Sequence, residues 1–197
     1  MPRLKHMIAA FAAALLALTA APALAQVREV EQSGRWTHAA TGTEFAERVA
    51  GFDRVSITEY TSDGRDASAS YRLRRDNGWA LVTLYVYPAP SPRCERTFAG
   101  IKRDITGAAA SAQFVSEGRA ASPSGRAANA ALLARFSYPA GAINSDFGEL
   151  RTEAYLFCAQ GGEWLVSYRA TWTPEVDFGP DVERLLHAID WPKAIAE

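Results

Sequence analysis

The sequence predicts an α+β domain with a largely antiparallel sheet of about seven strands and helices packed on it as an α/β/α sandwich. Short segments of alternating apolar and polar residues are separated by turn signals such as Asp76-Asn77-Gly78 and Gln160-Gly161-Gly162. Residues 79–87 are apolar at nearly every position, which is typical of a strand buried on both faces. Two further segments, one mid-chain and one near the C-terminus, space their apolar residues as helices do.

The first 25 residues have the three parts of a cleavable secretory signal peptide. Arg3 and Lys5 form the positive start, residues 8–18 form an uncharged apolar run, and Ala23-Leu24-Ala25 offers small residues to a signal peptidase. The run of about 11 residues is shorter than the ~20 that a membrane anchor needs. We therefore expect cleavage before Gln26 and a protein located in the periplasm or secreted.

The charge balance argues against several kinds of partner. The 197 residues contain 21 Lys and Arg and 22 Asp and Glu. Loss of Arg3 and Lys5 with the signal peptide would leave 19 against 22, a net charge of about −3. This balance disfavours nucleic acid and anionic membranes as partners. No second apolar stretch is long enough to span a membrane after signal cleavage.

The remaining residues suit one domain, with residues 26–52 as a weakly ordered lead-in and residues 53–197 as a single α+β domain. In the lead-in, Trp36 and Phe45 are expected to be local anchors, and residues 43–50 to form a short helix. Strands are predicted over 54–60, 68–75, 79–87, 113–119, 130–138, 148–158 and 163–172.

Two helices are predicted between and after these strands. The first follows a cap at Ser91-Pro92 and repeats apolar residues at spacings of 4, 3 and 4, from Cys94 onward. The second begins at Gly179-Pro180 and stops before Trp191-Pro192. The apolar stripes consist of Cys94, Phe98, Ile101 and Ile105 in the first helix and of Val182, Leu185, Leu186 and Ile189 in the second.

The two cysteines of the mature chain, Cys94 and Cys158, are expected to form one structural disulfide in an oxidising compartment. Two free buried thiols are the main alternative. A redox-active pair is a weaker one, because the cysteines are far apart and neither belongs to a Cys-x-x-Cys motif. A disulfide would fasten the start of the first helix to the sheet.

Residues that could carry catalysis are few, and we expect no metal and no cofactor. His38 and His187 have no ligand spacing to each other or to the cysteines. His38 is expected to be a solvated loop residue, whereas His187 lies late in a helix, where an imidazolium interacts with the carbonyl end. No Gly-x-Ser-x-Gly motif or phosphate-binding glycine loop is present, and we assign no catalytic residue.

Carboxylates cluster in sequence around Glu149 and Glu153, but general acid/base catalysis would need a cleft that brings two of them together. Tyr85 and Tyr87 on one strand, with Arg72 and Arg169 on strands nearby in sequence, are the candidates for a binding surface, because aromatic rings and arginines are enriched in binding surfaces. The interpretation that we favour is that the rings belong to the core and the arginines are solvated. Trp164, Tyr168 and Trp172 share one face of another strand.

The order of elements carries a family resemblance. An aromatic lead-in reaches Gly51-Phe52-Asp53-Arg54 and a strand, followed by the hairpin at residues 76–78, a long helix, further antiparallel strands and a closing helix. This order resembles the PsbP-like α/β/α sandwich of exported bacterial proteins. The resemblance implies a non-catalytic accessory or binding protein and transfers no functional residue.

We therefore expect an exported, soluble, non-enzymatic module that binds an envelope protein or a small ligand. The alternative is a hydrolase-type enzyme whose site is assembled only in three dimensions. A concave pocket with two or more titratable groups of shifted pKa would favour the enzyme. A third hypothesis is an interaction protein, which a long uncovered edge strand would favour.

Overall fold

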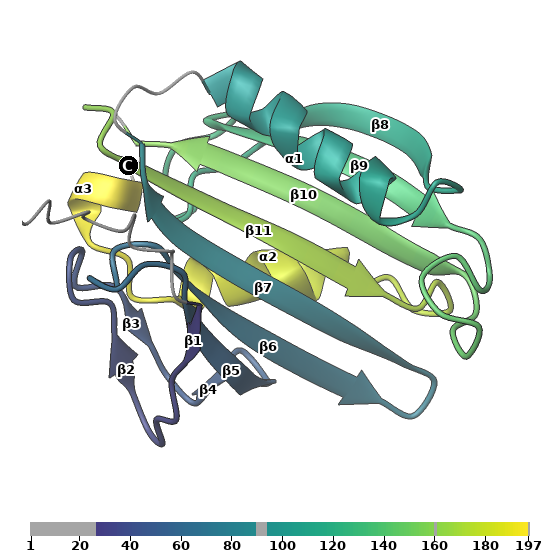
Figure 1. Ribbon diagram of the computed structural model, residues 1–197, viewed down its shortest axis with the longest axis horizontal. Helices are drawn as coiled ribbons and strands as arrows, with labels where there is room; N and C mark the ends of the chain where they lie inside the picture. Colours follow the sequence, from purple (N-terminus) through teal and green to yellow (C-terminus); the bar gives the residue numbers. More distant parts are fainter. Residues whose placement is uncertain (1–26, 90–93, 160, 197) are drawn as a thin grey trace, which may run out of the picture.

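The computed structural model describes residues 27–89, 94–159 and 161–196. The expected signal peptide and the expected cap at Ser91-Pro92 lie outside these residues. Within them, an antiparallel sheet of nine strands dominates the fold (Figure 1). Its spatial order is β1 (Arg28–Glu29), β5 (Phe52–Glu59), β6 (Ala67–Arg75), β7 (Gly78–Pro88), β11 (Trp164–Trp172), β10 (Leu150–Cys158), β9 (Ala131–Tyr138) and β8 (Gln113–Ala120), and β4 (Arg48–Val49) also pairs with β5.

The remaining elements are a small sheet and three helices. Strands β2 (Trp36–Thr37) and β3 (Glu44–Phe45) form a two-stranded sheet. The helices are α1 (Cys94–Ala108), α2 (Gly179–Ala188) and α3 (Lys193–Ala196). All seven predicted strands are present as the seven long strands of the sheet, and both predicted helices are present as α1 and α2.

The prediction of a short helix over residues 43–50 is wrong, because the chain there forms β3 and β4. Ala50 and Gly51 both adopt positive φ, and Val49 pairs with Phe52 on either side of them. Two successive positive φ values make the tight reversal of a hairpin, so the chain turns back into β5 instead of continuing as a helix. Residues 27–49 add two strands to the large sheet, and Trp36 and Phe45 are buried in the main core.

The prediction that residues 79–87 are buried on both faces of the sheet is also wrong. Every second side chain of β7, from Ala80 to Val86, is fully buried. The alternate side chains are only half-buried, and Leu81 is 38% exposed. The apolar run therefore covers one buried face and one partly open face, because α1 packs against β10 and leaves this part of its face uncovered.

The turn between β6 and β7 forms where the sequence predicts it, but for a different reason. Asn77 and Gly78 do not adopt positive φ. Instead, a Cβ atom on Gly78 would lie 2.5 Å from Oγ1 of Thr173, which follows β11. Glycine is needed at position 78 for close packing and not for backbone freedom.

The disulfide is confirmed: Cys94 and Cys158 are bonded, with their Cα atoms 6.1 Å apart. Cys94 is the first residue of α1, and Cys158 is the last residue of β10. Phe98 and Ile105 of α1 are buried in the same apolar cluster as Leu156 of β10. The disulfide thus fastens the start of α1 to the strand that the helix covers.

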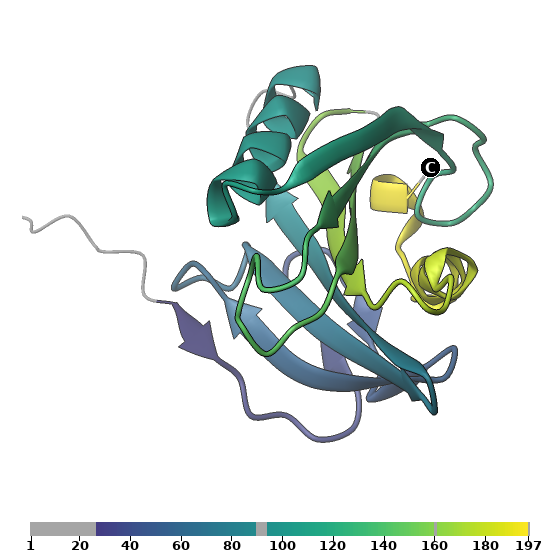
Figure 2. The same ribbon diagram turned by 90° about the vertical axis from the view of Figure 1, so that its right-hand side faces the viewer.

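Helix α2 lies on the other face of the sheet (Figure 2). Val182 and Leu185 are buried in the main core together with Tyr155 and Phe157, which alternate along β10 with the residues that face α1. The predicted stripe of α2 is therefore the face that packs on the sheet.

Replacing Leu186 in α2 by alanine is expected to destabilise the protein by roughly 2–5 kcal/mol, the usual cost of emptying a buried leucine site. Leu186 is 3% exposed, whereas its neighbour Leu185 is fully buried. Chemical denaturation should therefore show a cost for Leu186→Ala near the lower end of this range and a larger cost for Leu185→Ala. A near-zero change for both variants would contradict the packing of this helix face.

Candidate ligand-binding cavity

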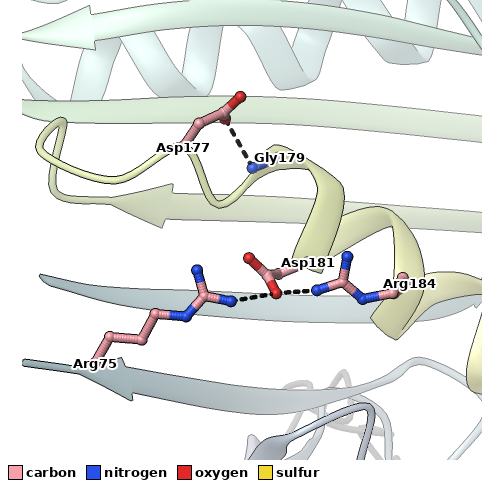
Figure 3. A network of polar contacts seen from close by, with 5 residues as sticks. All are labelled: Arg75, Asp177, Gly179, Asp181 and Arg184. Atoms are coloured by element: carbon pink, nitrogen blue, oxygen red, sulfur yellow. Dashed lines mark hydrogen bonds and ion pairs between the residues drawn. The ribbon is translucent and has the colours of Figure 1, made fainter.

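A polar network fixes the N-terminal turn of α2 over the sheet (Figure 3). The buried carboxylate of Asp181 accepts a hydrogen bond of 2.7 Å from Nη2 of Arg75 and also pairs with Arg184. The side chain of Asp177 accepts the backbone N–H of Gly179 at 3.0 Å. Since Arg75 ends β6, this network holds α2 at a set position relative to the large sheet.

A cavity of about 830 Å³ lies between α2 and the strands β9, β10 and β11. This volume falls within the range of small-molecule sites, about 300–1,000 Å³. Buried side chains form its floor, and exposed side chains form its rim. The floor includes Leu133, Glu153, Tyr155, Tyr168, Trp172 and Leu186, and the half-buried or exposed lining includes Arg135, Ser137, Glu149, Arg151, Glu183 and His187.

The strand register explains why these side chains meet. Arg151 of β10 is opposite Trp172 on β11 and Ser137 on β9. Two residues further along β10, Glu153 is opposite Arg135. Residues paired or offset by two on neighbouring strands share one face of a sheet. The cavity wall is therefore built from successive rows across three strands.

Glu153 is the buried charge of the cavity floor. Its side chain is 7% exposed, and Oε1 accepts a 2.7 Å hydrogen bond from Nε of Arg135. Its other oxygen, Oε2, accepts a 3.2 Å hydrogen bond from the Tyr168 hydroxyl. The Arg135 side chain is 52% exposed, so the pair spans from the floor of the cavity to its rim.

The rings of Tyr155 and Tyr168 stack beneath the cavity, with their centroids 4.9 Å apart and their planes within 5°. Burial raises the pKa of both hydroxyls far above the usual value, and the negative charge of Glu153 raises that of Tyr168 further. The pocket thus contains two titratable groups with shifted pKa, but both phenols stay protonated at physiological pH. Each donates its one hydroxyl hydrogen within the protein, Tyr155 to the Ala121 carbonyl and Tyr168 to Glu153, and neither can act as a general base near neutrality.

Two hydrogen-bond donors at the cavity have no partner in the part of the chain that the structure describes. The indole N–H of Trp172 is buried and has no acceptor there. The guanidinium of Arg151 forms no hydrogen bond or ion pair with any described residue. A buried N–H without an acceptor is costly to the folded state, whereas the exposed Arg151 guanidinium is available to water and to molecules that enter the cavity.

The predicted binding residues Tyr85, Tyr87, Arg72 and Arg169 do not line the cavity. They lie on the opposite face of the sheet, which α1 covers only in part. Arg169 donates a 2.8 Å hydrogen bond from Nη2 to the Tyr138 hydroxyl. Burial raises the pKa of Tyr85 to about 12. The structure brings these residues to one face, and their role as a binding surface stays a prediction.

The sequence contains a pattern that marks some of the cavity residues, but it does not show that these residues meet in space. Arg151, Glu153 and Tyr155 alternate along a strand with Leu150, Thr152, Ala154 and Leu156. Two charges on one face of a strand that the core otherwise needs are the signal for a polar cavity. Alternation along the sequence places Tyr168 and Trp172 on one face of a strand, but only the sheet order places that face against Glu153.

Strand β8 ends the sheet, and most of its residues are exposed, including Phe114 at 56% and Val115 at 59%. This is the uncovered edge strand that an interaction protein would use. However, the register between β8 and β9 shifts between Phe114 and Ser116. Such an irregularity interrupts the regular edge that an added strand would need.

His38 is buried, so the prediction that it is a solvated loop residue is wrong. Its Nδ1 lies 2.8 Å from the Thr41 hydroxyl, and its Nε2 lies 3.2 Å from the carbonyl oxygen of Arg65. The ring also meets Trp36 and Trp164 edge-on. A neutral imidazole satisfies both contacts, with Nε2–H donating to the carbonyl and Nδ1 accepting from the hydroxyl.

The burial of His38 predicts a loss of stability in acid. Burial lowers the pKa of His38 below its ordinary value, and the Arg65 carbonyl offsets part of this effect. The unfolded chain therefore binds the proton first, so the stability from neutral His38 is complete above pH ~6.5 and is lost as the pH falls below it. In urea unfolding from pH ~7.5 to ~5, the stability advantage of the wild type over His38→Gln should shrink; an advantage that stays constant would contradict this.

Fold and cavity together define a disulfide-linked, antiparallel sheet domain with a polar, aromatic-floored cavity beneath a helix. None of the described helices is long and apolar enough to cross a membrane. Comparisons with family models, curated proteins and solved structures found no match to this chain. The cavity is therefore the feature of the molecule that bears most directly on its function.

Proposed function

We propose that this protein is a non-enzymatic binding module that takes a small ligand in the cavity beneath α2. The observation that carries the proposal is a cavity of about 830 Å³ with a buried aromatic floor and a few convergent polar groups. Ligand sites in proteins combine these two features.

The groups on the cavity floor favour binding over the alternative, a hydrolase-type enzyme. Both oxygens of Glu153 accept hydrogen bonds, from Arg135 and Tyr168. A carboxylate engaged in this way is a poor general base. Tyr155 and Tyr168 hold their protons far above neutral pH. The floor thus offers mainly aromatic and aliphatic surface, which ligand pockets use to bury a bound molecule.

We further propose that the module is exported, soluble and active in the bacterial envelope. We also propose that the sheet, with helices on both of its faces, forms a PsbP-like α/β/α sandwich. The signal-like residues 1–25 support export, and contacts of α1 and α2 with opposite faces support the sandwich. Mass spectrometry of the exported protein should find Gln26 at its N-terminus. Retention of residues 1–25 would contradict the proposed cleavage.

The binding proposal is tested by a thermal-shift screen of a chemically mixed small-molecule library, followed by calorimetry. Ser137→Trp should abolish binding of true cavity ligands, because Ser137 lines the cavity and is half-buried. The matched control is Leu81→Trp, on the partly open region of the opposite face. Binding that survives Ser137→Trp would contradict the cavity proposal, and conversion of a bound compound, detected by mass spectrometry, would favour the hydrolase.

A further inference from the structure

Strand β8 forms one edge of the nine-stranded sheet (Figure 1). It pairs with β9 along one side, and no described residue forms a strand along its other side. Its side chains are mostly exposed, including two large apolar ones, Phe114 and Val115. An edge strand of this kind presents unpaired backbone N–H and C=O groups to another chain. A strand added here would extend the sheet.

The irregularity between Phe114 and Ser116 limits how much of this edge can accept a strand. Beyond it, residues 116–120 pair in unbroken register with residues 131–135 of β9. The irregularity therefore excludes a long added strand but leaves five regular residues. This length is close to that of a common β-strand, about 5–6 residues. In so short a pairing, the side chains that lie opposite each other decide the register.

The charges on this part of the edge are complementary to themselves. Glu117 and Arg119 flank Gly118, and all three residues are exposed. In an antiparallel pair of β8 strands with a two-fold axis at Gly118, Glu117 of each copy is opposite Arg119 of the other copy. An axis at Glu117 or at Arg119 would instead place like charges opposite each other, which is destabilising. The charges thus favour one register of the three.

Both charged side chains can reach a second copy. Arg119 forms no hydrogen bond or ion pair with any described residue. Glu117 uses Oε2 for Nζ of Lys102 in α1, so its Oε1 remains available as an acceptor. Glycine at position 118 has open space around it, which lets the two backbones approach closely at the axis.

The charge balance beside the edge favours a copy of the same chain over a strongly acidic or strongly basic partner. The pocket between α1 and β8 is lined by two acids, Glu95 and Glu117, and two bases, Lys102 and Arg119. A surface with equal numbers of both signs gives no advantage to a partner of either sign. A second copy, by contrast, presents the same charges in the reversed order that the antiparallel pairing requires.

From this arrangement we infer that two copies of the mature chain associate through β8 as a symmetric dimer with its axis at Gly118. The two strands exchange backbone hydrogen bonds over residues 116–120, and one Glu117–Arg119 pair lies on each side of the axis. This contact is separate from the ligand cavity and does not depend on the proposed binding function. Because so short a contact buries less surface than stable dimers do, the dimer is weak and forms as the concentration rises.

The dimer is tested first by its dependence on concentration. Sedimentation velocity of the mature chain from about 10 μM to about 1 mM should show a monomer–dimer equilibrium. Hydrogen exchange at the two ends of this range should show that the amides of residues 116–120 gain protection in the dimer. A chain that stays monomeric throughout, or a dimer in which β8 gains no protection, would overturn the inference. So would a monomeric chain whose β8 gains protection only when envelope proteins are added, since the edge would then serve another partner.

Charge-reversal variants test the register. Glu117→Lys places like charges opposite each other at both symmetry-related pairs, and so does Arg119→Glu, so each variant alone should dimerise at least about tenfold more weakly than the wild type. A one-to-one mixture of the two variants has opposite charges at both pairs and should form a mixed dimer with nearly the wild-type affinity.

The matched control for these variants is Lys102→Met, which removes the ion pair of Glu117 within one copy but leaves both edge charges in place. This variant should dimerise like the wild type. A mixture of the two reversal variants that associates no better than either alone would overturn the proposed register, and so would reversal variants that dimerise as tightly as the wild type.

Discussion

Replacing Cys94 and Cys158 together by alanine is expected to lower the free energy of unfolding by roughly 4 kcal/mol. The disulfide joins residues 64 positions apart, so it removes a large loop from the conformations open to the unfolded chain. This is an upper figure, because strain in the folded state would reduce it. The loss corresponds to a fall of roughly 10 °C in Tm for a domain of this size.

The matched control for this prediction is the wild-type protein under reducing conditions. Urea denaturation should give the same lowered stability for the reduced wild type and for the double alanine variant, with or without reductant. Non-reducing peptide mapping should recover a peptide pair joined through Cys94 and Cys158. Native thiols that alkylate freely, or a wild-type stability unaffected by reductant, would refute the role of the disulfide.

The long strands and both main helices could be predicted because each leaves a local signature in the sequence. Alternation along residues 68–75 and helical spacing from Cys94 onward depend only on near neighbours. The pairing of Cys94 with Cys158 could be predicted because no other cysteine competes in the mature chain. These features require no knowledge of how the strands are ordered.

Failures in the prediction arose where distant parts of the chain decide the outcome. The burial of β7 depends on where α1 packs, and a sequence cannot show that α1 covers β10 instead. The burial of His38 depends on the Arg65 carbonyl and on Trp164, which are far away in the sequence. Short strands such as β3 and β4 have too few residues to show a periodicity.

The cavity could be predicted only in pieces, for the same reason. The charges of Arg151 and Glu153 and the aromatic face of β11 can be read directly from the sequence. That they meet depends on β11 lying between β7 and β10, and on β9 supplying Arg135. The predicted surface around Tyr85 was a correct grouping of residues on one face, but its face is opposite the cavity.

Replacing Arg135 by methionine is expected to cost about 2 kcal/mol of stability, because it leaves the carboxylate of Glu153 without its cation. Removing one partner of a wholly buried pair costs more, about 3–5 kcal/mol. Arg135 is half-exposed and the cavity admits water, so the smaller value applies here. Urea denaturation at neutral pH measures the loss, and an unchanged stability would mean that Tyr168 and water suffice for Glu153.

The double variant Arg135→Met/Glu153→Met should recover most of this loss, because no buried charge is then left unpaired. Tyr168 would lose its acceptor, so recovery should be completed only when Tyr168→Phe is added. If this apolar triple variant is as stable as the wild type but no longer binds the ligands found in the thermal-shift screen, the pair serves recognition and not folding. If it is much less stable, the network of Arg135, Glu153 and Tyr168 is needed for the fold itself, and its position in the cavity would be no argument for a ligand.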